Sequence, residues 1–224
     1  MKRLAFIIAS IVILSACFKI DDRKPDILPR IPDQNPNDLL NDPALNETGN
    51  ILFIGNSLTY TNDLPGLLKD YALTHGKDIG TAVHALPNTS LQDHWDAGRV
   101  QQYISSGKFA YVVIQQGPSS QSEGRNILLE YGAKFKSICD EHQARLAFFM
   151  VWPARQHYHT FEGVIKNYSD AAWTHQSILC PVGKIWKDYM DSSQDFSYYG
   201  GDGFHPSLKG SQIAAEIIYH SLFE

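Results

Sequence analysis

The chain of 224 residues has the length of one folded domain with a tail. Hydrophobic residues make up 43% of it and aromatic residues 12%, which is enough for a sizeable core. The formal net charge is −5, from 19 Lys and Arg residues against 24 Asp and Glu residues. Because nucleic-acid binding needs clustered basic side chains, and no basic run exists beyond Lys2-Arg3, the composition argues against a nucleic-acid partner.

The N-terminus has the pattern of an export signal. A positively charged start precedes an apolar run over residues 4–14, which is too short to span a bilayer comfortably. The run ends in L-S-A-C at residues 14–17, which resembles the lipobox of bacterial lipoproteins. The resemblance implies that residues 1–16 are a signal peptide and that an acylated Cys17 anchors the protein in a membrane. The alternatives are an ordinary signal peptide cleaved elsewhere and a short membrane anchor.

The residues that follow Cys17 predict location and a tether. Lys19 followed by Asp21 and Asp22 resembles the surface-export signal of some Gram-negative lipoproteins, so we expect an exported protein on the outer membrane, facing the cell surface. Residues 17–48 are polar, contain five prolines and lack any helical or strand period. This composition predicts an extended tether, with the folded domain over residues 49–224.

From residue 50 onward, strand-like apolar runs alternate with helical periodicity. We expect strands over residues 50–55, 79–86, 109–115, 145–152 and 177–182. We expect helices over residues 63–75, 92–105, 123–142, 161–175, 184–190 and 208–223. This alternation predicts a three-layer α/β/α domain, in which helices cover both faces of a roughly five-stranded parallel sheet.

Cys139 and Cys180 lie in two of these expected elements, a helix and a strand. An oxidising compartment would permit a disulfide between them. Two buried free thiols are the alternative, because free cysteine behaves as a small apolar side chain.

Two loops at opposite ends of the domain hold the residue types of a nucleophilic triad. Ligands of parallel sheets bind outside the carboxyl ends of the strands, and Ser57 directly follows the first strand. Asp202 and His205 stand three residues apart, before the last helix, so the carboxylate can orient the imidazole. The second ring nitrogen of His205 can then take the proton of Ser57. We therefore expect Asp202, His205 and Ser57 to lie within hydrogen-bond reach of one another, in that order.

The sequences around these residues resemble a known family. G-N-S-L at residues 55–58 and D-G-F-H-P at residues 202–206 are similar to the first and last signature blocks of the SGNH/GDSL hydrolases, whose usual first block is G-D-S-L. The resemblance covers residues 50–223 and implies the flavodoxin-like fold of that family. It also implies Ser57 as nucleophile and as an oxyanion donor through its N–H, His205 as base and Asp202 as its orienting carboxylate. No cofactor is expected.

The middle of the sequence departs from the family pattern. Asn88 stands where the family has the Gly whose N–H binds the oxyanion, and Asn tolerates a left-handed backbone better than most residues. The family's Asn donor has no counterpart, because the third strand ends in Gln115-Gln116-Gly117. A Gln amide can donate the same hydrogen bond. We favour Gln116, which precedes the turn at Gly117, over Gln115, with Ser119 as a third choice.

Further candidates for substrate binding lie near the same edge of the sheet. His94 follows the second block and either contacts substrate or has a structural role at a helix start. Trp152 and Arg155 follow the fourth strand, where Trp could stack on a sugar ring and Arg could bind a carboxylate. A strand-end aromatic without such a role is the alternative. His157 and His159 have no third ligand at a suggestive spacing, so we expect no metal site.

These features predict a serine esterase that removes acetyl groups from a polysaccharide at the cell surface. The substrate follows from the expected location and the family resemblance. A lysophospholipase or short-chain lipid esterase is one alternative, and a catalytically weak glycan-binding lipoprotein is another, because the middle blocks are altered. The intact trio favours an enzyme, since a binding protein has no physical need for it.

Overall fold

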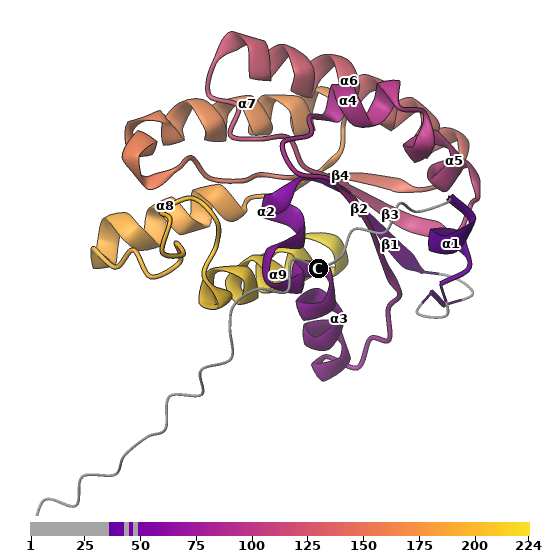
Figure 1. Cartoon of the computed structure of the whole chain (residues 1–224), viewed down its shortest axis with the longest axis horizontal. Coiled ribbons are helices and arrows are strands. Elements are labelled where there is room, and N and C mark those ends of the chain that lie inside the picture. The colour runs from indigo at the N-terminus through magenta and orange to yellow at the C-terminus, as the bar shows by residue number, and fades with distance from the viewer. Residues whose placement is uncertain (1–35, 43–44, 47–48) are drawn as a thin grey trace, which may run out of the picture.

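The computed structural model describes residues 36–42, 45–46 and 49–224, and these form a three-layer α/β/α domain (Figure 1). Five parallel strands make one sheet in the order β2-β1-β3-β4-β5. The predicted fold class is confirmed. The strands are β1 (Asn50–Gly55), β2 (Thr81–Ala85), β3 (Phe109–Ile114), β4 (Arg145–Phe149) and β5 (Ile178–Cys180).

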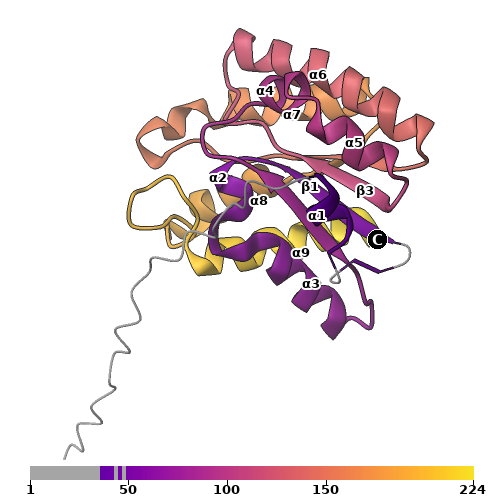
Figure 2. The same cartoon turned by 45° about the vertical axis from the view of Figure 1, so that its right-hand side comes forward.

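The longer helices lie in two layers, one on each face of the sheet (Figure 1, Figure 2). One layer holds α4 (Leu91–Asp96), α5 (Arg99–Ser105), α6 (Ser122–Glu141) and α7 (Phe161–Thr174). The other holds α3 (Leu64–Thr74), α8 (Val182–Ser193) and α9 (Leu208–Phe223). Shorter helical segments are α1 (Pro36–Leu40), α2 (Ser57–Tyr60), η1 (Thr61–Asp63) and η2 (Arg155–Thr160).

The central strand β1 is buried along its whole length. It pairs with β2 on one side and β3 on the other, so both of its edges are hydrogen-bonded to neighbouring strands. Its apolar side chains pack against helices on both faces of the sheet, as expected for a parallel strand. The end of β1 therefore has a fixed position from which the following turn begins.

Three expectations about the elements are corrected by the structure. The helix expected over residues 92–105 is two helices, because Gly98 between them has φ +75°, a left-handed conformation that ends α4. The strand expected over residues 145–152 ends at Phe149. The fifth strand has three residues, where we expected six over residues 177–182.

The segment expected as an extended tether contains part of the fold. Pro36–Leu40 forms α1, in which the side chain of Leu39 is buried. Lys108 Nζ donates a hydrogen bond of 2.6 Å to the carbonyl oxygen of Leu40. The N–H of Asn46 donates to Asn50 Oδ1 at the start of β1. Residues before 49 therefore take part in the folded domain, whereas the expected signal peptide and Cys17 lie outside the described residues.

The two cysteines of the domain are free and buried. Burial raises the pKa of each thiol, Cys139 and Cys180, to about 12. Of the two alternatives, the structure has buried thiols in place of a disulfide. Within residues 36–42, 45–46 and 49–224, no helix is long and apolar enough to cross a membrane.

A buried histidine on β2 makes stability depend on pH. His84 is 5% exposed and its ring lies 5.1 Å from that of His94 and 5.2 Å from that of Tyr103. Burial, followed by the charges of His94 and Arg99, lowers the pKa of His84 from 6.5 to about 4. Between these two pH values the unfolded chain binds a proton at this residue and the folded chain does not.

We therefore expect the free energy of unfolding to fall as the pH decreases from 6.5 towards 4. The substitution His84→Leu should weaken this dependence, because the variant no longer gains a proton at this position on unfolding. Urea unfolding followed by tryptophan fluorescence at pH 7, 5.5 and 4.5 measures the effect. Parallel losses of stability in the wild type and the variant would contradict the assignment.

Candidate active site

The turn after β1 presents Ser57 at the carboxyl edge of the sheet. β1 ends at Gly55 and α2 begins at Ser57, with the extended residue Asn56 as the helix N-cap. Asn56 Oδ1 accepts a hydrogen bond of 3.1 Å from the N–H of Leu58. This capping role needs a short side chain with an acceptor oxygen, which explains how Asn replaces Asp in the motif without moving the serine.

The turn before α9 carries Asp202 and His205. Asp202 Oδ1 accepts hydrogen bonds of 2.9 Å from the N–H groups of both Phe204 and His205. Asp202 Oδ2 lies 2.6 Å from His205 Nδ1, and His205 Nε2 lies 2.9 Å from Ser57 Oγ. The three side chains thus form a continuous chain of hydrogen bonds, in the order expected from the sequence.

The carboxylate of Asp202 is held in its charged form. Partial burial by itself raises the pKa of Asp202, but the hydrogen bonds from the His205 ring and from the N–H groups of Phe204 and His205 outweigh it. The net result is a pKa below the usual value. A charged Asp202 beside Nδ1 keeps the proton on that nitrogen and leaves Nε2 free to accept the hydrogen of Ser57 Oγ.

The two turns are far apart in sequence and are joined by direct contacts. Ser57 and His205 are separated by 148 positions. Helices α3 and α9, which follow the two turns, pack against each other. Asn62, in η1 after the first turn, connects to the second turn and to α9. Its Nδ2 donates hydrogen bonds of 3.0 Å to the carbonyl oxygen of Pro206 and to Ser211 Oγ.

Ser57 opens into a pocket of about 290 Å³ at the carboxyl ends of β1, β2 and β3. Asn88 lies in its wall with φ +56°, the left-handed backbone expected for the residue that replaces Gly. Ser90 and Phe204 also line the pocket, and the sequence did not predict a role for either one. The position of Phe204 between Asp202 and His205 is the signal that could have pointed to it. The lining consists of the polar residues Asn56, Ser57, Asn88, Thr89, Ser90 and Gln116, together with Gly117, Pro118 and Phe204.

The structure separates the roles of the two glutamines. Gln116 lines the pocket, and its Oε1 accepts a hydrogen bond of 2.8 Å from the N–H of Leu91, which fixes the amide. Its Nε2 has no hydrogen-bond partner among the described residues and is available to a ligand. Gln115 is fully buried and uses both ends of its amide inside the protein. Gln115 as an oxyanion donor is therefore wrong, and Ser119, whose hydroxyl donates to the Gly117 carbonyl, does not line the pocket.

Two of the expected substrate contacts are also wrong. Trp152 is fully buried, its ring stacks on Trp186 at 3.6 Å, and its Nε1 donates to the carbonyl oxygen of Phe204. His94 is 1% exposed, and its Nε2 lies 2.7 Å from the carbonyl oxygen of Gly55. Both side chains are surrounded by protein, so neither can touch a substrate.

Arg155 lies beside the turn that carries Asp202 and does not line the pocket. Its N–H donates a hydrogen bond of 2.8 Å to the carbonyl oxygen of Gly203. Its exposed guanidinium lies 4.4 Å from the centre of the Phe196 ring. Within the described part of the chain, no three His, Cys, Asp or Glu side chains are grouped so that they could hold a metal ion.

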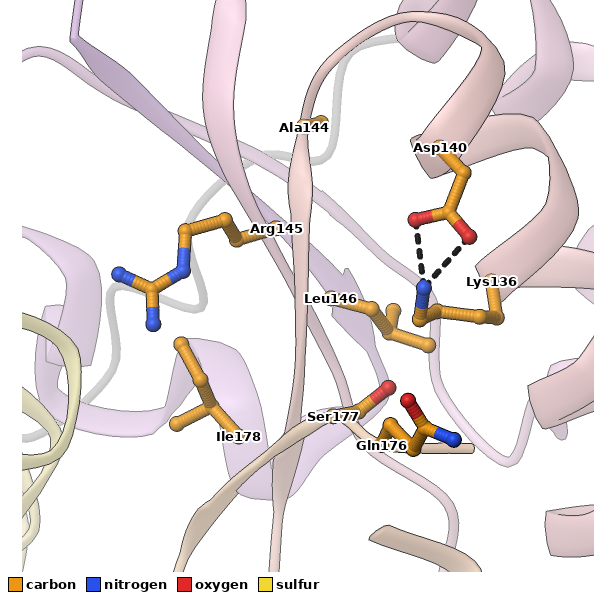
Figure 3. Close-up of a pocket in the computed structure, with 8 residues that line it drawn as sticks. All are labelled: Lys136, Asp140, Ala144, Arg145, Leu146, Gln176, Ser177 and Ile178. Carbon is orange, nitrogen blue, oxygen red and sulfur yellow. Dashed lines mark hydrogen bonds and ion pairs between the residues drawn. The ribbon is translucent and has the colours of Figure 1, made fainter. Parts of the chain in front are cut away.

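A second hollow, of about 350 Å³, lies at the opposite edge of the sheet (Figure 3). It is bounded by Arg145 and Ile178 at the amino ends of β4 and β5. Lys136 and Asp140 form an ion pair in its wall. The pocket at Ser57 is the candidate active site, because a hydroxyl lies beside a hydrogen-bonded imidazole there.

Comparison with known proteins identifies the fold. No family model matches the sequence, and no curated protein matches it. Solved structures do match, among them a protein from Slackia heliotrinireducens assigned to the SGNH hydrolases. It has a TM-score of 0.67 and 21% sequence identity, and the match covers 78% of this chain and 99% of that one. The chain has the SGNH-hydrolase fold.

Other solved structures match over similar lengths. A lipase/acylhydrolase from Enterococcus faecalis has a TM-score of 0.62 and 17% identity, covering 78% of this chain and 95% of its own. An acetyl-xylooligosaccharide esterase from Geobacillus, solved as a mutant, has a TM-score of 0.58 and 16% identity. The match covers 80% of this chain and 97% of that one. The SGNH-hydrolase fold thus accounts for nearly the whole of the domain from β1 to α9.

Proposed function

We propose that the protein is a serine esterase of the SGNH/GDSL type that works through an acyl-enzyme intermediate. The observation that carries the proposal is the chain of hydrogen bonds from Asp202 through His205 to Ser57, beside a pocket. A serine hydroxyl is a weak nucleophile until a base takes its proton. In these hydrogen bonds His205 is the base, and Asp202 holds its ring in the required tautomer.

The reaction has two halves. Ser57 Oγ attacks the ester carbonyl while its proton passes to His205 Nε2, and His205 then gives that proton to the departing alkoxide, which leaves as the alcohol. Water attacks the acyl-serine in the second half, with His205 again taking a proton. The acid is released and Ser57 regains its hydroxyl hydrogen. Asp202 stabilises the imidazolium that forms in each half.

Three donors around the pocket suit the negative oxygen that develops during both attacks. They are the N–H of Ser57 at the start of α2, the N–H of Asn88 and the Nε2 of Gln116. Gln116 takes the place of the Asn side chain found in the family. Its fixed amide supports this role, because preorganised donors do not have to be reoriented when the charge appears.

The pocket supports a small acyl group on a polar alcohol. The pocket has a volume of only about 290 Å³, and the apolar residues in its lining are Gly117, Pro118 and Phe204, whereas a long acyl chain requires an extended apolar wall. The structural similarity to an acetyl-xylooligosaccharide esterase agrees with this chemistry. We therefore propose removal of acetyl groups from a carbohydrate as the reaction. The lipobox-like motif at residues 14–17 supports an exported protein, anchored through Cys17 to the cell envelope, where polysaccharide substrates are found.

The substrate class is tested on the full chain in mild detergent. We expect hydrolysis of p-nitrophenyl acetate and of acetylated xylo-oligosaccharides, and little or no hydrolysis of p-nitrophenyl palmitate or lysophosphatidylcholine. Ser57→Ala should lower kcat by roughly a thousandfold or more, because the nucleophile is lost. Ser137→Ala, on the exposed face of α6, is the matched control and should keep full activity.

Preference for the long-chain esters would replace the deacetylase proposal with a lipid esterase. If glycans bind but no ester is turned over, the protein is a binding protein and the esterase proposal fails.

The oxyanion donor is tested at Gln116. Gln116→Ala should lower kcat by about 10²-fold with little change in KM, because the hydrogen bond strengthens mainly in the transition state. Ser119→Ala removes a neighbouring hydroxyl that bonds only within its own loop, and kcat should be retained. A Gln116→Ala enzyme with wild-type kcat would mean that the two backbone N–H groups suffice.

The anchor is tested at Cys17. Cys17→Ser should abolish both the incorporation of labelled palmitate and the sedimentation of the protein with membranes, because the thiol that carries the lipid is absent. Cys139→Ala is the matched control, since that thiol is buried in the domain and cannot be acylated there. Unchanged labelling of the Cys17→Ser protein would show that the lipoprotein interpretation is wrong.

A further inference from the structure

The peptide group that precedes the Asn56-Ser57 pair is held from both sides by buried side chains. The carbonyl oxygen of Gly55 accepts a hydrogen bond of 2.7 Å from His94 Nε2, in addition to one of 3.1 Å from the N–H of Leu86. At the other end of the same peptide group, the N–H of Asn56 donates to Gln115 Oε1 over 2.9 Å. The backbone therefore cannot rotate at this point without breaking hydrogen bonds on opposite sides.

We infer that His94 and Gln115 are positioning residues, which clamp the Gly55–Asn56 peptide group and so fix Ser57 Oγ against His205. The inference rests on the proposed esterase function and deepens it. Both residues are buried, and neither lines the pocket. Each acts through the backbone of the nucleophile turn.

Gln115 also connects this turn to the proposed oxyanion donor. Its Oε1 accepts a second hydrogen bond of 2.9 Å, from Thr59 Oγ1 in α2, and its Nε2 donates over 2.7 Å to the carbonyl oxygen of Gln116. One amide thus ties α2, the nucleophile turn and the backbone of Gln116 together. The buried hydroxyl of Tyr168 donates to the same carbonyl oxygen, so Gln116 is held from two directions.

Two further observations show that the clamp is close-fitting. A Cβ atom at position 55 would overlap both Thr59 Oγ1 and Gln115 Oε1, so the turn needs Gly for the close approach of these groups. The carbonyl of Gly55 can only accept, so Nε2 of His94 carries the hydrogen. Its Nδ1 is buried without a hydrogen-bond partner among the described residues. Burial lowers the pKa of His94, which keeps the ring in the neutral form that this geometry uses.

The test compares kcat and KM for p-nitrophenyl acetate in the full chain. His94→Leu and Gln115→Met remove the hydrogen bonds and retain apolar bulk. Each should lower kcat by roughly 10- to 100-fold with KM unchanged, because a nucleophile misplaced by about 1 Å reacts far more slowly in a site that still binds substrate. His94→Gln should recover most of the activity, since the Gln amide can again donate to the Gly55 carbonyl.

Asn50→Leu is the matched control for lost buried hydrogen bonds. Asn50 is buried at the other end of β1, where its Nδ2 donates to the carbonyl oxygens of Asn46 and Lys108. This variant should lose thermal stability as the clamp variants do and keep kcat. If His94→Leu does not fold, His94→Asn replaces it, because its shorter amide cannot reach Gly55. Gln115→Asn replaces Gln115→Met for the same reason.

A crystal structure of each clamp variant gives a readout that does not depend on turnover. We expect the Gly55–Asn56 peptide group to turn and the hydrogen bond between Ser57 Oγ and His205 Nε2, now 2.9 Å, to be lost. Wild-type kcat in both clamp variants, or an unmoved Ser57 in their structures, overturns the inference and leaves the esterase proposal standing. If the wild type hydrolyses no ester, the esterase proposal fails, and the crystallographic distance still decides whether the clamp positions Ser57.

Discussion

Backbone polar atoms at the end of a buried strand must find hydrogen-bond partners inside the protein, because no water reaches them. β1 meets this constraint through its two neighbouring strands, but the turn that follows it leaves the sheet. At that turn the partners are side chains: His94 for the Gly55 carbonyl and Gln115 for the Asn56 N–H. Polar residues in an otherwise apolar core are therefore what allows Ser57 to stand at the edge of the sheet in one conformation.

The turn that carries Asp202 and His205 meets the same constraint with different partners. Trp152 Nε1 donates to the Phe204 carbonyl, and the hydroxyl of Tyr199 donates over 2.8 Å to the carbonyl of Pro153. These bonds attach the turn to the chain that follows β4. The buried side chains of Trp152 and Tyr199 thus support the loop that holds His205, and neither lines the pocket.

The departures from the usual SGNH/GDSL blocks are each compatible with the chemistry that the family requires. Asn56 caps α2 through its side-chain oxygen as an Asp would. Asn88 adopts the left-handed backbone usually reserved for Gly. Gln116 extends an amide from the end of β3, and the N–H of Leu91 holds that amide in place. Altered motif residues therefore do not by themselves indicate a degenerate site.

The sequence by itself determined the order of strands and helices, the layered fold and the trio of Ser57, Asp202 and His205. Periodicity and burial of apolar runs are local properties, and the trio consists of residue types whose chemistry has few other uses in that arrangement. Only the tertiary structure decided which glutamine lines the pocket, and that His94 and Trp152 are buried and do not line it. Whether a polar or aromatic side chain at the end of a strand faces solvent or core depends on which distant helix and loop cover it. Which helix or loop covers a side chain depends on long-range packing, and a local sequence pattern does not predict it.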